Sequence, residues 1–222
     1  MERTPRPEGA KLGTGYDPAM SRPGDTTSHL RLSTFDNRSF DRGAPRWTEA
    51  LWFLVRRIFF DTQLPVPSAI KTFWLRRFGA EVGRGVVIRS KVNITFPWRF
   101  RCGNDVWIGD EVLILSLAEV SIGNDCCISQ RAFLCTGSHD FSRPSFDLVT
   151  APITIADGCW VCAQVFLGPG TTLGTGSRCL PGGVVHGEVP AGCTVGGVPA
   201  KIIRTLKGKQ NPQEPQATQA IF

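Results

Sequence analysis

The chain of 222 residues carries 25 Lys and Arg against 19 Asp and Glu, which gives a net charge of +6. This modest excess comes without a zinc-finger, helix-turn-helix or RNA-recognition pattern, so it does not indicate a dedicated nucleic-acid-binding protein. The first twenty residues have no apolar core typical of a secretory signal, and no apolar run reaches the roughly 18 residues that span a bilayer. We therefore expect a cytoplasmic protein in a reducing compartment, and the 24 Gly and 16 Pro favour a turn-rich β architecture.

The N-terminal part of the chain divides into an arm and two predicted helices. Residues 1–45 are rich in Pro, Gly, Ser, Thr, Arg and Asp, which predicts a flexible arm with a short ordered piece around Leu30–Phe40. Apolar residues at helical spacing predict an amphipathic helix over 46–61 and a second helix over 67–78. We expect residues 46–80 to form a helical cap.

The two predicted helices are basic and rich in aromatic residues, and Glu49 and Asp61 are their acids. One interpretation is that they lie on an anionic membrane surface, at the inner face of the membrane. The other, which we favour, is that their aromatic residues cover the open end of the β structure that follows. The cations are Arg46, Arg56, Arg57, Lys71, Arg76 and Arg77, and the aromatic residues include Trp47, Trp52, Phe53, Phe59, Phe60, Phe73 and Trp74.

An aliphatic residue or Cys recurs every six residues through the middle of the chain. A period of six fits neither an α-helix nor a simple strand, so it predicts a β-solenoid with one short strand and one turn per hexad. Three hexads make one rung of a triangular prism, and the first residue of each hexad points inward together with the residue four positions later. The rungs are 82-88-94, 102-108-114, 122-128-134, 155-161-167 and 173-179-185, with Val195 closing the stack. The second inward residues are Val106, Val112, Ala118, Cys126, Ala132, Cys159, Val165, Thr171 and Ser177.

The six-residue period is interrupted in three places. Two extra residues follow the hexads that begin at Ile94 and at Ile114, which predicts small bulges at corners of the prism. A larger excursion of about fifteen residues separates Leu134 from Ile155, and it contains His139 near its start. Because a long loop in a regular scaffold is commonly functional, this segment is the candidate for an active site.

The eight Cys residues are better explained by packing than by metal or disulfide chemistry. Cys102, Cys126, Cys159 and Cys179 fall on inward positions of the repeat, where Cys behaves as a small apolar residue. The C-x-x-C pair that begins at Cys159 has no second pair at zinc spacing. We therefore expect buried thiols and no metal site.

The repeat, together with the motifs ISQRAFLCTGSHD and GGVPAKIIR, resembles the hexapeptide-repeat acyltransferases. Within that superfamily the chain is similar to sugar O-acetyltransferases of the colanic-acid type and, more distantly, to galactoside, maltose and nodulation-factor acetyltransferases. The resemblance covers about residues 47–206. It implies a mainly β fold, a left-handed parallel β-helix of about five coils over residues 81–206. The composition beyond the repeat predicts a C-terminal basic extension and a disordered polar tail over 207–222.

The resemblance also implies an activity and its residues. The family transfers an acetyl group from acetyl-CoA to a sugar hydroxyl, and the His that ends the TGSH stretch, here His139, is its catalytic base. A neutral imidazole suits that role because its ordinary pKa is near 6.5. Asp140 is a candidate to orient the ring or contact the acceptor, and an acceptor-binding Asn of an early coil corresponds to Asn93. Acetyl-CoA lies between neighbouring subunits of a homotrimer, where the corresponding residues are Ala163, Pro181, Lys201 and Arg204.

Two other functions use the same kind of solenoid. A γ-type carbonic anhydrase holds its metal with three His, but this chain has three His in all and one of them, His29, lies in the predicted arm. A non-catalytic scaffold subunit is the second alternative. The intact TGSHD stretch argues against a scaffold, whereas the segment from Gly187 to Pro190 departs from the family pattern and keeps that alternative open.

Overall fold

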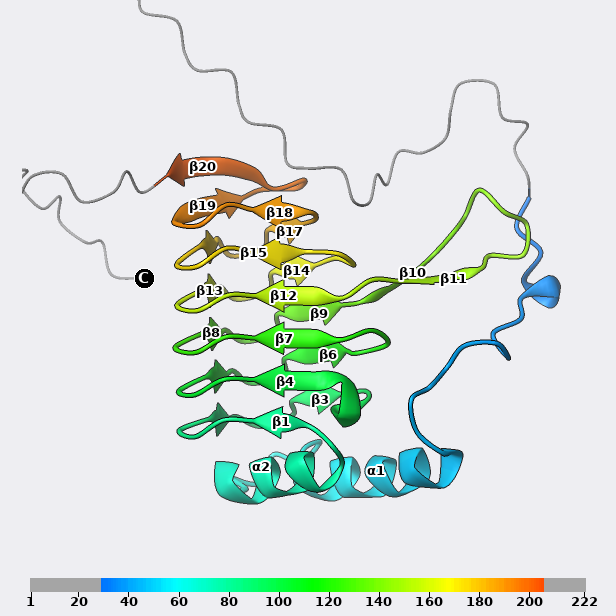
Figure 1. Ribbon diagram of the computed structural model, residues 1–222, viewed down its shortest axis with the longest axis horizontal. Helices are drawn as coiled ribbons and strands as arrows, with labels where there is room; N and C mark the ends of the chain where they lie inside the picture. The colour runs from blue at the N-terminus through cyan, green and yellow to red at the C-terminus, as the bar shows by residue number, and fades with distance from the viewer. Residues whose placement is uncertain (1–28, 206–222) are drawn as a thin grey trace, which may run out of the picture.

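The computed structural model describes residues 29–205, which form a three-sided β-solenoid with two helices across its N-terminal end (Figure 1). Each of the five complete coils contributes one short strand to each of three sheets, and these strands pair in parallel. Sheet A contains β1 (Glu81–Val82), β4 (Phe100–Cys102), β7 (Val120–Ile122), β12 (Ile153–Ile155), β15 (Thr172–Leu173) and β18 (Glu188–Val189). Sheet B contains β2 (Val87–Ile88), β5 (Trp107–Ile108), β8 (Cys127–Ile128), β13 (Trp160–Val161), β16 (Arg178–Cys179), β19 (Cys193–Gly196) and β20 (Lys201–Thr205). Sheet C contains β3 (Asn93–Ile94), β6 (Leu113–Leu115), β9 (Phe133–Cys135), β14 (Phe166–Leu167) and β17 (Val184–Val185).

The register of sheet A confirms the predicted rungs. Val82 pairs with Cys102, Cys102 with Ile122, Ile122 with Ile155, and Ile155 with Leu173. The long excursion is therefore looped out of the solenoid, because β7 before it and β12 after it pair in the same parallel register as the other neighbouring strands of sheet A. The five expected coils are present, and β18 and β19 add a partial sixth coil beyond the single closing residue that the sequence predicted.

All twelve predicted leading residues from Cys102 to Val185 are buried inside the prism. The second inward positions are buried as well, with one exception. Ala118 is half-buried, and Ser116 takes the inward place in that coil, where its hydroxyl accepts from the Phe96 N–H at 2.8 Å and donates to the Phe96 carbonyl at 3.0 Å. The prediction for Ala118 was wrong because the bulge adds two residues between β6 and β7. These residues shift which side chain of the segment points into the prism.

The coils approach each other so closely at one corner that glycine is required. A Cβ on Gly83 would lie 2.3 Å from the carbonyl oxygen of Gly103 in the next coil. The same corner carries a ladder of side-chain amides and carboxylates, in which Asn124 Oδ1 accepts from the N–H of Asn104 and Asp157 Oδ1 accepts from the N–H of Asn124. These contacts fix the spacing of successive coils along the solenoid.

The helices α1 (Arg46–Phe59) and α2 (Ser68–Arg77) lie side by side across the first coil, close to their predicted bounds (Figure 1). Trp52 and Leu75 are buried against this coil, and the indole N–H of Trp52 donates to the carbonyl of Ile94 at 2.9 Å. The cap that we favoured from the sequence is therefore present. Among the described residues, no helix has the length and apolarity that crossing a bilayer requires.

Both ends of the described chain pack on the solenoid. Residues 29–45, which include a 3-10 helix (Leu32–Thr34), run along its side as a strap. At the other end the basic extension is not a helix or a loose tail. It forms β20, which pairs antiparallel with β19 so that Lys201 lies opposite Gly196. The predicted flexibility of residues 1–28 and disorder of 207–222 fall on parts of the chain outside the described residues.

Candidate active site

Three insertions stack at the corner where sheet C leads into sheet A of the next coil, here called the C–A corner. They span residues 95–99, which include a 3-10 helix (Pro97–Arg99), 116–119 and 136–152. The inserted segments touch, since a Cβ on Gly137 would lie 2.7 Å from Cδ1 of Leu117 in the coil before. The side-chain hydroxyl of Thr136 also joins these two levels, because it donates to the Leu115 carbonyl at 2.6 Å. The three interruptions of the sequence thus build one surface.

The longest insertion is an antiparallel hairpin of β10 (Gly137–His139) and β11 (Leu148–Thr150), which projects from the solenoid (Figure 1). His139 ends β10 and is half-buried. Its Nδ1 atom lies 2.8 Å from the carbonyl oxygen of Phe146. The Phe146 ring stacks on the imidazole, with centroids 4.1 Å apart and an interplanar angle of 1°.

The contact with Phe146 determines which imidazole nitrogen can accept a proton. A backbone carbonyl only accepts hydrogen bonds, so Nδ1 of the neutral imidazole must carry the hydrogen. Nε2 then holds the free lone pair. Nε2 is therefore the imidazole nitrogen that can accept a proton, and Phe146 covers one face of the ring.

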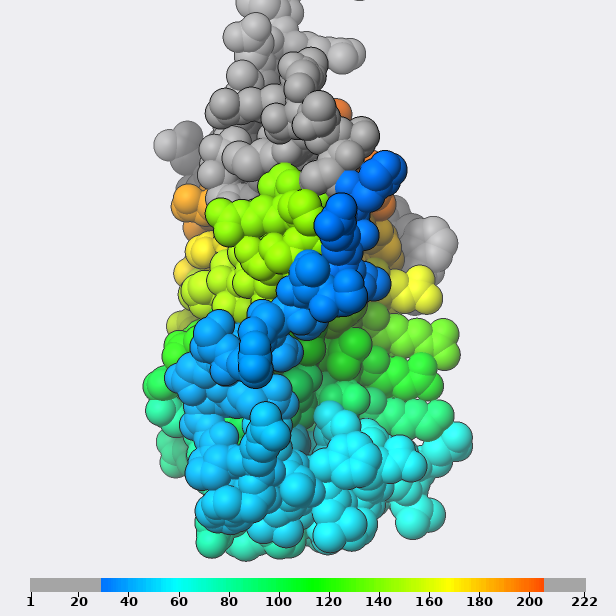
Figure 2. Space-filling view, turned by 90° about the vertical axis from the view of Figure 1, so that its right-hand side faces the viewer, coloured from blue at the N-terminus to red at the C-terminus, as the bar shows by residue number. Residues whose placement is uncertain are grey.

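The N-terminal strap reaches the same histidine. Figure 2 shows residues 29–45 as a diagonal band that runs from the helical cap to the hairpin. The Phe35 ring meets the His139 imidazole edge-on, with centroids 5.4 Å apart. The N–H of Arg31 donates to the carbonyl of Pro144 at 2.8 Å, which ties the strap to the tip of the hairpin. The strap therefore forms a wall beside His139 that the prediction of a flexible arm did not include.

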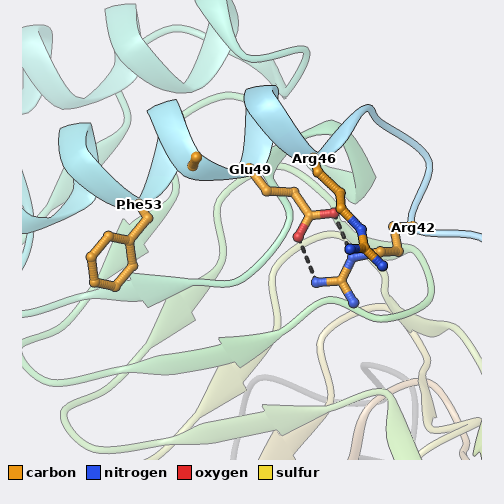
Figure 3. A pocket seen from close by; sticks show the side chains of 5 residues that line it. Arg42, Arg46, Glu49 and Phe53 are labelled. Carbon is orange, nitrogen blue, oxygen red and sulfur yellow. Dashed lines mark hydrogen bonds and ion pairs between the residues drawn. The ribbon is translucent and has the colours of Figure 1, made fainter. Parts of the chain in front are cut away.

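The lower part of the strap is fixed on the first insertion, which is itself bonded to the second. The indole N–H of Trp98 donates to the Arg42 carbonyl at 2.8 Å, and Arg99 donates to the carbonyls of Asp41 and Leu117. The Arg42 guanidinium holds Glu49 of α1 in a two-bond ion pair of 2.5 Å, which lowers the pKa of that carboxyl. Figure 3 shows this pair at one side of an open hollow of about 450 Å³ that Arg46, Ala50 and Phe53 also line.

Asp140 does not orient the imidazole as we expected. Its carboxylate accepts from the N–H and hydroxyl of Ser142, at 3.0 and 2.6 Å, and lies 3.4 Å from the Arg143 guanidinium. The Phe146 carbonyl occupies the orienting position instead. Asp140 shapes the turn at the tip of the hairpin, and its predicted contact with the acceptor stays a prediction.

Asn93 lies in the first coil, two coils before the strand that leads into His139. Its side-chain oxygen accepts from the Arg56 guanidinium of α1 at 2.8 Å. The structure therefore does not bring Asn93 to His139 in one chain. The acceptor role that the resemblance implied stays a prediction.

Three of the four predicted acetyl-CoA residues, Ala163, Pro181 and Lys201, lie at another corner, where sheet B leads into sheet C, here called the B–C corner. Ala163 and Pro181 lie in turns of consecutive coils, since the N–H of Gly182 donates to the Ala163 carbonyl at 3.0 Å. Ala163 lines a hollow of about 280 Å³ together with Gln130, Arg131 and Gln164, and with two acids, Asp110 and Glu111. These acids already pair with Arg89 and Arg131.

The terminal cations are placed differently from one another. Lys201 begins β20 at the B–C corner, because the turn before it is held to β17 by the Ala200 N–H, which donates to the Val184 carbonyl at 2.8 Å. Arg204 lies farther along β20, opposite Thr194. Both side chains are exposed at the C-terminal end of the solenoid.

A single chain therefore does not bring the predicted catalytic residue and the predicted acetyl-CoA residues together. His139 is on the hairpin at the C–A corner, whereas Ala163 and Pro181 are at the B–C corner, and sheet C lies between the two corners. Neither Phe35 nor the Phe146 carbonyl was predicted from the sequence to contact His139. The aromatic rings near His139 were a usable signal, but a backbone carbonyl leaves no trace in the choice of residue.

The cysteine thiols within residues 29–205 are mostly buried. The four predicted inward cysteines are buried, and burial raises the pKa of Cys102 to about 11 and that of Cys179 to about 12. All eight cysteines are free. Within residues 29–205 no three His, Cys, Asp or Glu side chains cluster in a way that could hold a metal ion.

Comparison with known proteins agrees with this architecture. No model of a protein family matches the chain. The "Putative colanic acid biosynthesis acetyltransferase" of Escherichia coli (strain K12) is 38% identical over 173 residues, which are 78% of this chain and 95% of that protein. The chain belongs to the hexapeptide-repeat acetyltransferase family. The resemblance recognised in the motifs is thereby confirmed.

Solved structures of this acetyltransferase family share the fold. A hexapeptide-repeat-containing acetyltransferase of Vibrio cholerae O1 biovar eltor, complexed with acetyl coenzyme A, is 27% identical with a TM-score of 0.66 and covers 74% of this chain and 92% of its own. A galactoside acetyltransferase in complex with coenzyme A has a TM-score of 0.68 at 19% identity and covers 79% and 90%. The expected left-handed parallel β-helix of an acetyltransferase is confirmed.

Proposed function

We propose that this acetyltransferase moves the acetyl group of acetyl-CoA onto a sugar hydroxyl in the biosynthesis of a bacterial polysaccharide. The observation that carries the proposal is His139, whose Nδ1 is held by the Phe146 carbonyl so that Nε2 can accept a proton. The relative named for colanic acid biosynthesis, which aligns over nearly its whole length, supports a polysaccharide acceptor. Acetyl coenzyme A in the related Vibrio structure supports the donor.

In the proposed reaction His139 is a general base and then a general acid. Nε2 removes the proton of the acceptor hydroxyl as its oxygen attacks the thioester carbonyl carbon. When the tetrahedral intermediate collapses, the carbon–sulfur bond breaks and the thiolate takes the proton from Nε2. The Phe146 carbonyl favours both stages, because it keeps the ring in place and stabilises the positive charge that the imidazole carries between them.

The donor is assigned to the B–C corner. Ala163 and Pro181 present small or rigid side chains along consecutive coils, which leaves room for the extended pantetheine arm of acetyl-CoA. Lys201 and Arg204 at the C-terminal end are exposed cations that suit the phosphates of the coenzyme. Asn93 and Asp140 remain candidates for contacts with the acceptor.

The proposal includes a homotrimer, because the site is incomplete in one chain. Sheet A presents polar side chains outward: Glu81, Arg101, Ser121, Thr154, Thr172 and Glu188. Sheets B and C present mostly apolar side chains outward, together with Asn93, Arg178 and Thr194: Val87, Trp107, Cys127, Trp160, Leu113, Phe133, Phe166 and Val184. Apolar outer faces of this kind favour burial against a partner. A neighbouring copy would bring its B–C corner to the projecting His139 hairpin.

The proposal also includes a place in the cell. The enzyme would act in the cytoplasm, in peripheral contact with the inner face of the membrane through residues 46–78. That position suits an acceptor that is a growing lipid-linked glycan.

The test is release of CoA from acetyl-CoA with a panel of sugars and glycan fragments. Wild type should show acceptor-dependent release, and His139→Ala and His139→Asn should each lower kcat by about 10²-fold or more, the range expected for a lost general base. Asn is the sharper variant because its amide can still donate to the Phe146 carbonyl. Phe141→Ala, in the same hairpin but exposed, is the matched control.

The result also separates the proposal from its alternative. If His139→Asn keeps wild-type activity, another group is the base. If no acceptor supports turnover, calorimetry with acetyl-CoA decides the matter. Binding would indicate an acceptor outside the panel, whereas the absence of binding would favour the non-catalytic scaffold.

A further inference from the structure

The helical cap has an apolar outer face in addition to the inner face that covers the first coil. Trp47, Leu51, Leu54 and Ile58 follow one another at the spacing of a single helix stripe on α1, and their exposed fractions run from 46% at Leu51 to 70% at Trp47. Leu64 in the connection between the helices, and Ile70 and Phe73 on α2, are exposed apolar residues of the same cap. We call these seven residues the basal face. Each of them is exposed.

The basal face is not needed to close the solenoid. Other residues of the cap, among them Trp52, Phe60, Leu75 and Phe78, are buried on the first coil. A surface helix with one buried stripe ordinarily presents polar side chains to water. Within the described residues, eight of the sixteen exposed large hydrophobic side chains lie between Trp47 and Phe73. This concentration marks a contact surface rather than scattered exposure.

The charges around the basal face are positive. Arg46, Arg57 and Arg77 are exposed on α1 and α2. Both acids of the cap are paired with cations, since Glu49 binds Arg42 at 2.5 Å and Asp61 lies 3.5 Å from Arg57 and 3.8 Å from Arg56. The surface therefore combines an apolar stripe with a surplus of guanidinium groups.

We propose that the basal face docks on a bilayer surface that contains anionic lipids. The two helices lie flat across one end of the solenoid (Figure 1), so their stripes can enter the headgroup region together. Each Arg near an anionic membrane strengthens binding by roughly fivefold, and Trp47 is suited to the membrane interface. A second copy of this face is the less favourable partner, because its cations would oppose those of the first.

This arrangement has a consequence for the proposed trimer. A threefold axis parallel to the solenoid would place three basal faces at the same end of the assembly, and they would contact the bilayer together. The inference deepens the peripheral contact named in the proposed function, but it rests on the cap alone. Vesicle binding and acetyl transfer can therefore fail independently.

The experiment is co-sedimentation of the full chain with vesicles of phosphatidylcholine, with and without an equal part of phosphatidylglycerol. Wild type should bind the anionic vesicles at least tenfold more tightly, and added salt should weaken that binding. The variant Leu51→Gln, Leu54→Gln, Ile58→Gln should lose at least tenfold in affinity while it remains folded, because these side chains are exposed and Gln suits a helix. Arg46→Gln, Arg57→Gln, Arg77→Gln should lose the preference for anionic lipid.

The control is Val198→Gln with Ile203→Gln, which removes two exposed apolar side chains at the opposite end of the solenoid. This control should bind vesicles as wild type does. Equal binding by the triple Leu/Ile variant and by wild type would overturn the proposal, as would equal binding of wild type to neutral and anionic vesicles. Light scattering measures the oligomeric state of the triple Leu/Ile variant. If this variant forms a smaller oligomer than wild type, the basal face is a contact between copies. The membrane proposal is then wrong.

Discussion

The carbonyl oxygen of Phe146 lies 2.8 Å from Nδ1 of His139, and the ring of the same Phe146 stacks on the imidazole at 4.1 Å. One residue therefore fixes both the tautomer and the plane of the proposed base. Phe146 achieves this with a positive φ of 54°, a backbone conformation that glycine adopts without strain.

Phe146→Gly should leave the turn intact and remove the stacked ring. We expect kcat to fall by about 10- to 100-fold because the imidazole is less well positioned, with little change in the KM for acetyl-CoA. Steady-state kinetics against both substrates provide the check. Phe141→Gly is the control in the same hairpin, and equal loss in both variants would mean that the loop, not the ring, is responsible.

The contact between Phe35 and His139 predicts a different kinetic effect. The strap forms a wall beside the base, so Phe35→Ala should raise the KM for the acceptor by roughly tenfold, about the energy of one aromatic contact. The KM for acetyl-CoA should not change, because the donor residues lie at the B–C corner. A rise in the KM for acetyl-CoA alone would contradict this prediction, because it would mean that Phe35 contacts the donor rather than the acceptor.

His186 predicts how stability depends on pH. Burial lowers the pKa of this imidazole in the folded protein. The unfolded chain, with a His pKa near 6.5, then binds a proton before the folded chain does, so stability is full above about pH 6.5 and falls as the pH is lowered through and below that value. Denaturant unfolding at pH 7.5 and pH 5.5 measures this loss. His186→Gln should reduce the difference between the two values, and an unchanged difference would assign it to other groups.

The closest approach of a glycine to the backbone of the next coil predicts a large effect from one methyl group. Gly83→Ala would place a Cβ 2.3 Å from the Gly103 carbonyl oxygen, and we expect it to lower the free energy of unfolding by about 3 kcal/mol. Gly176→Ala is the matched comparison, because its Cβ would meet no atom within 4 Å and only the positive φ of 68° opposes it. That variant should cost about 1 kcal/mol. Equal losses on guanidinium unfolding would show that contact between coils is not the limiting factor.

The solenoid could be predicted from the sequence because every coil repeats the same burial requirement. Leading residues such as Ile108, Leu134 and Leu173 are fully buried as the period demands. The period carries no information where it is interrupted, which is why Ala118 was assigned inward in place of Ser116. The positions of the three insertions could be predicted from the sequence, but their conformations could not.

The site was predicted in part. The motif named His139, but its orientation depends on the Phe146 carbonyl and on contacts across a hairpin, which residue types do not encode. Residues 1–45 were predicted to be a flexible arm with a short ordered piece around Leu30–Phe40, because their composition is polar and rich in Pro and Gly. The bonds from Trp98 and Arg99 to the carbonyls of Arg42 and Asp41 extend the order beyond that piece. Such tertiary contacts override local composition.

The most direct test of the account mixes two inactive variants in one oligomer. Four preparations would be compared. Three are wild type, His139→Ala and Ala163→Phe, each purified alone. The fourth contains mixed oligomers, purified from cells that coexpress the two variant chains under different tags. If the site joins His139 of one copy to the B–C corner of the next, random mixed trimers should recover about a quarter of wild-type CoA release, since one interface in four pairs two intact halves. Mixed oligomers that stay as inactive as either parent would contradict a site shared between copies.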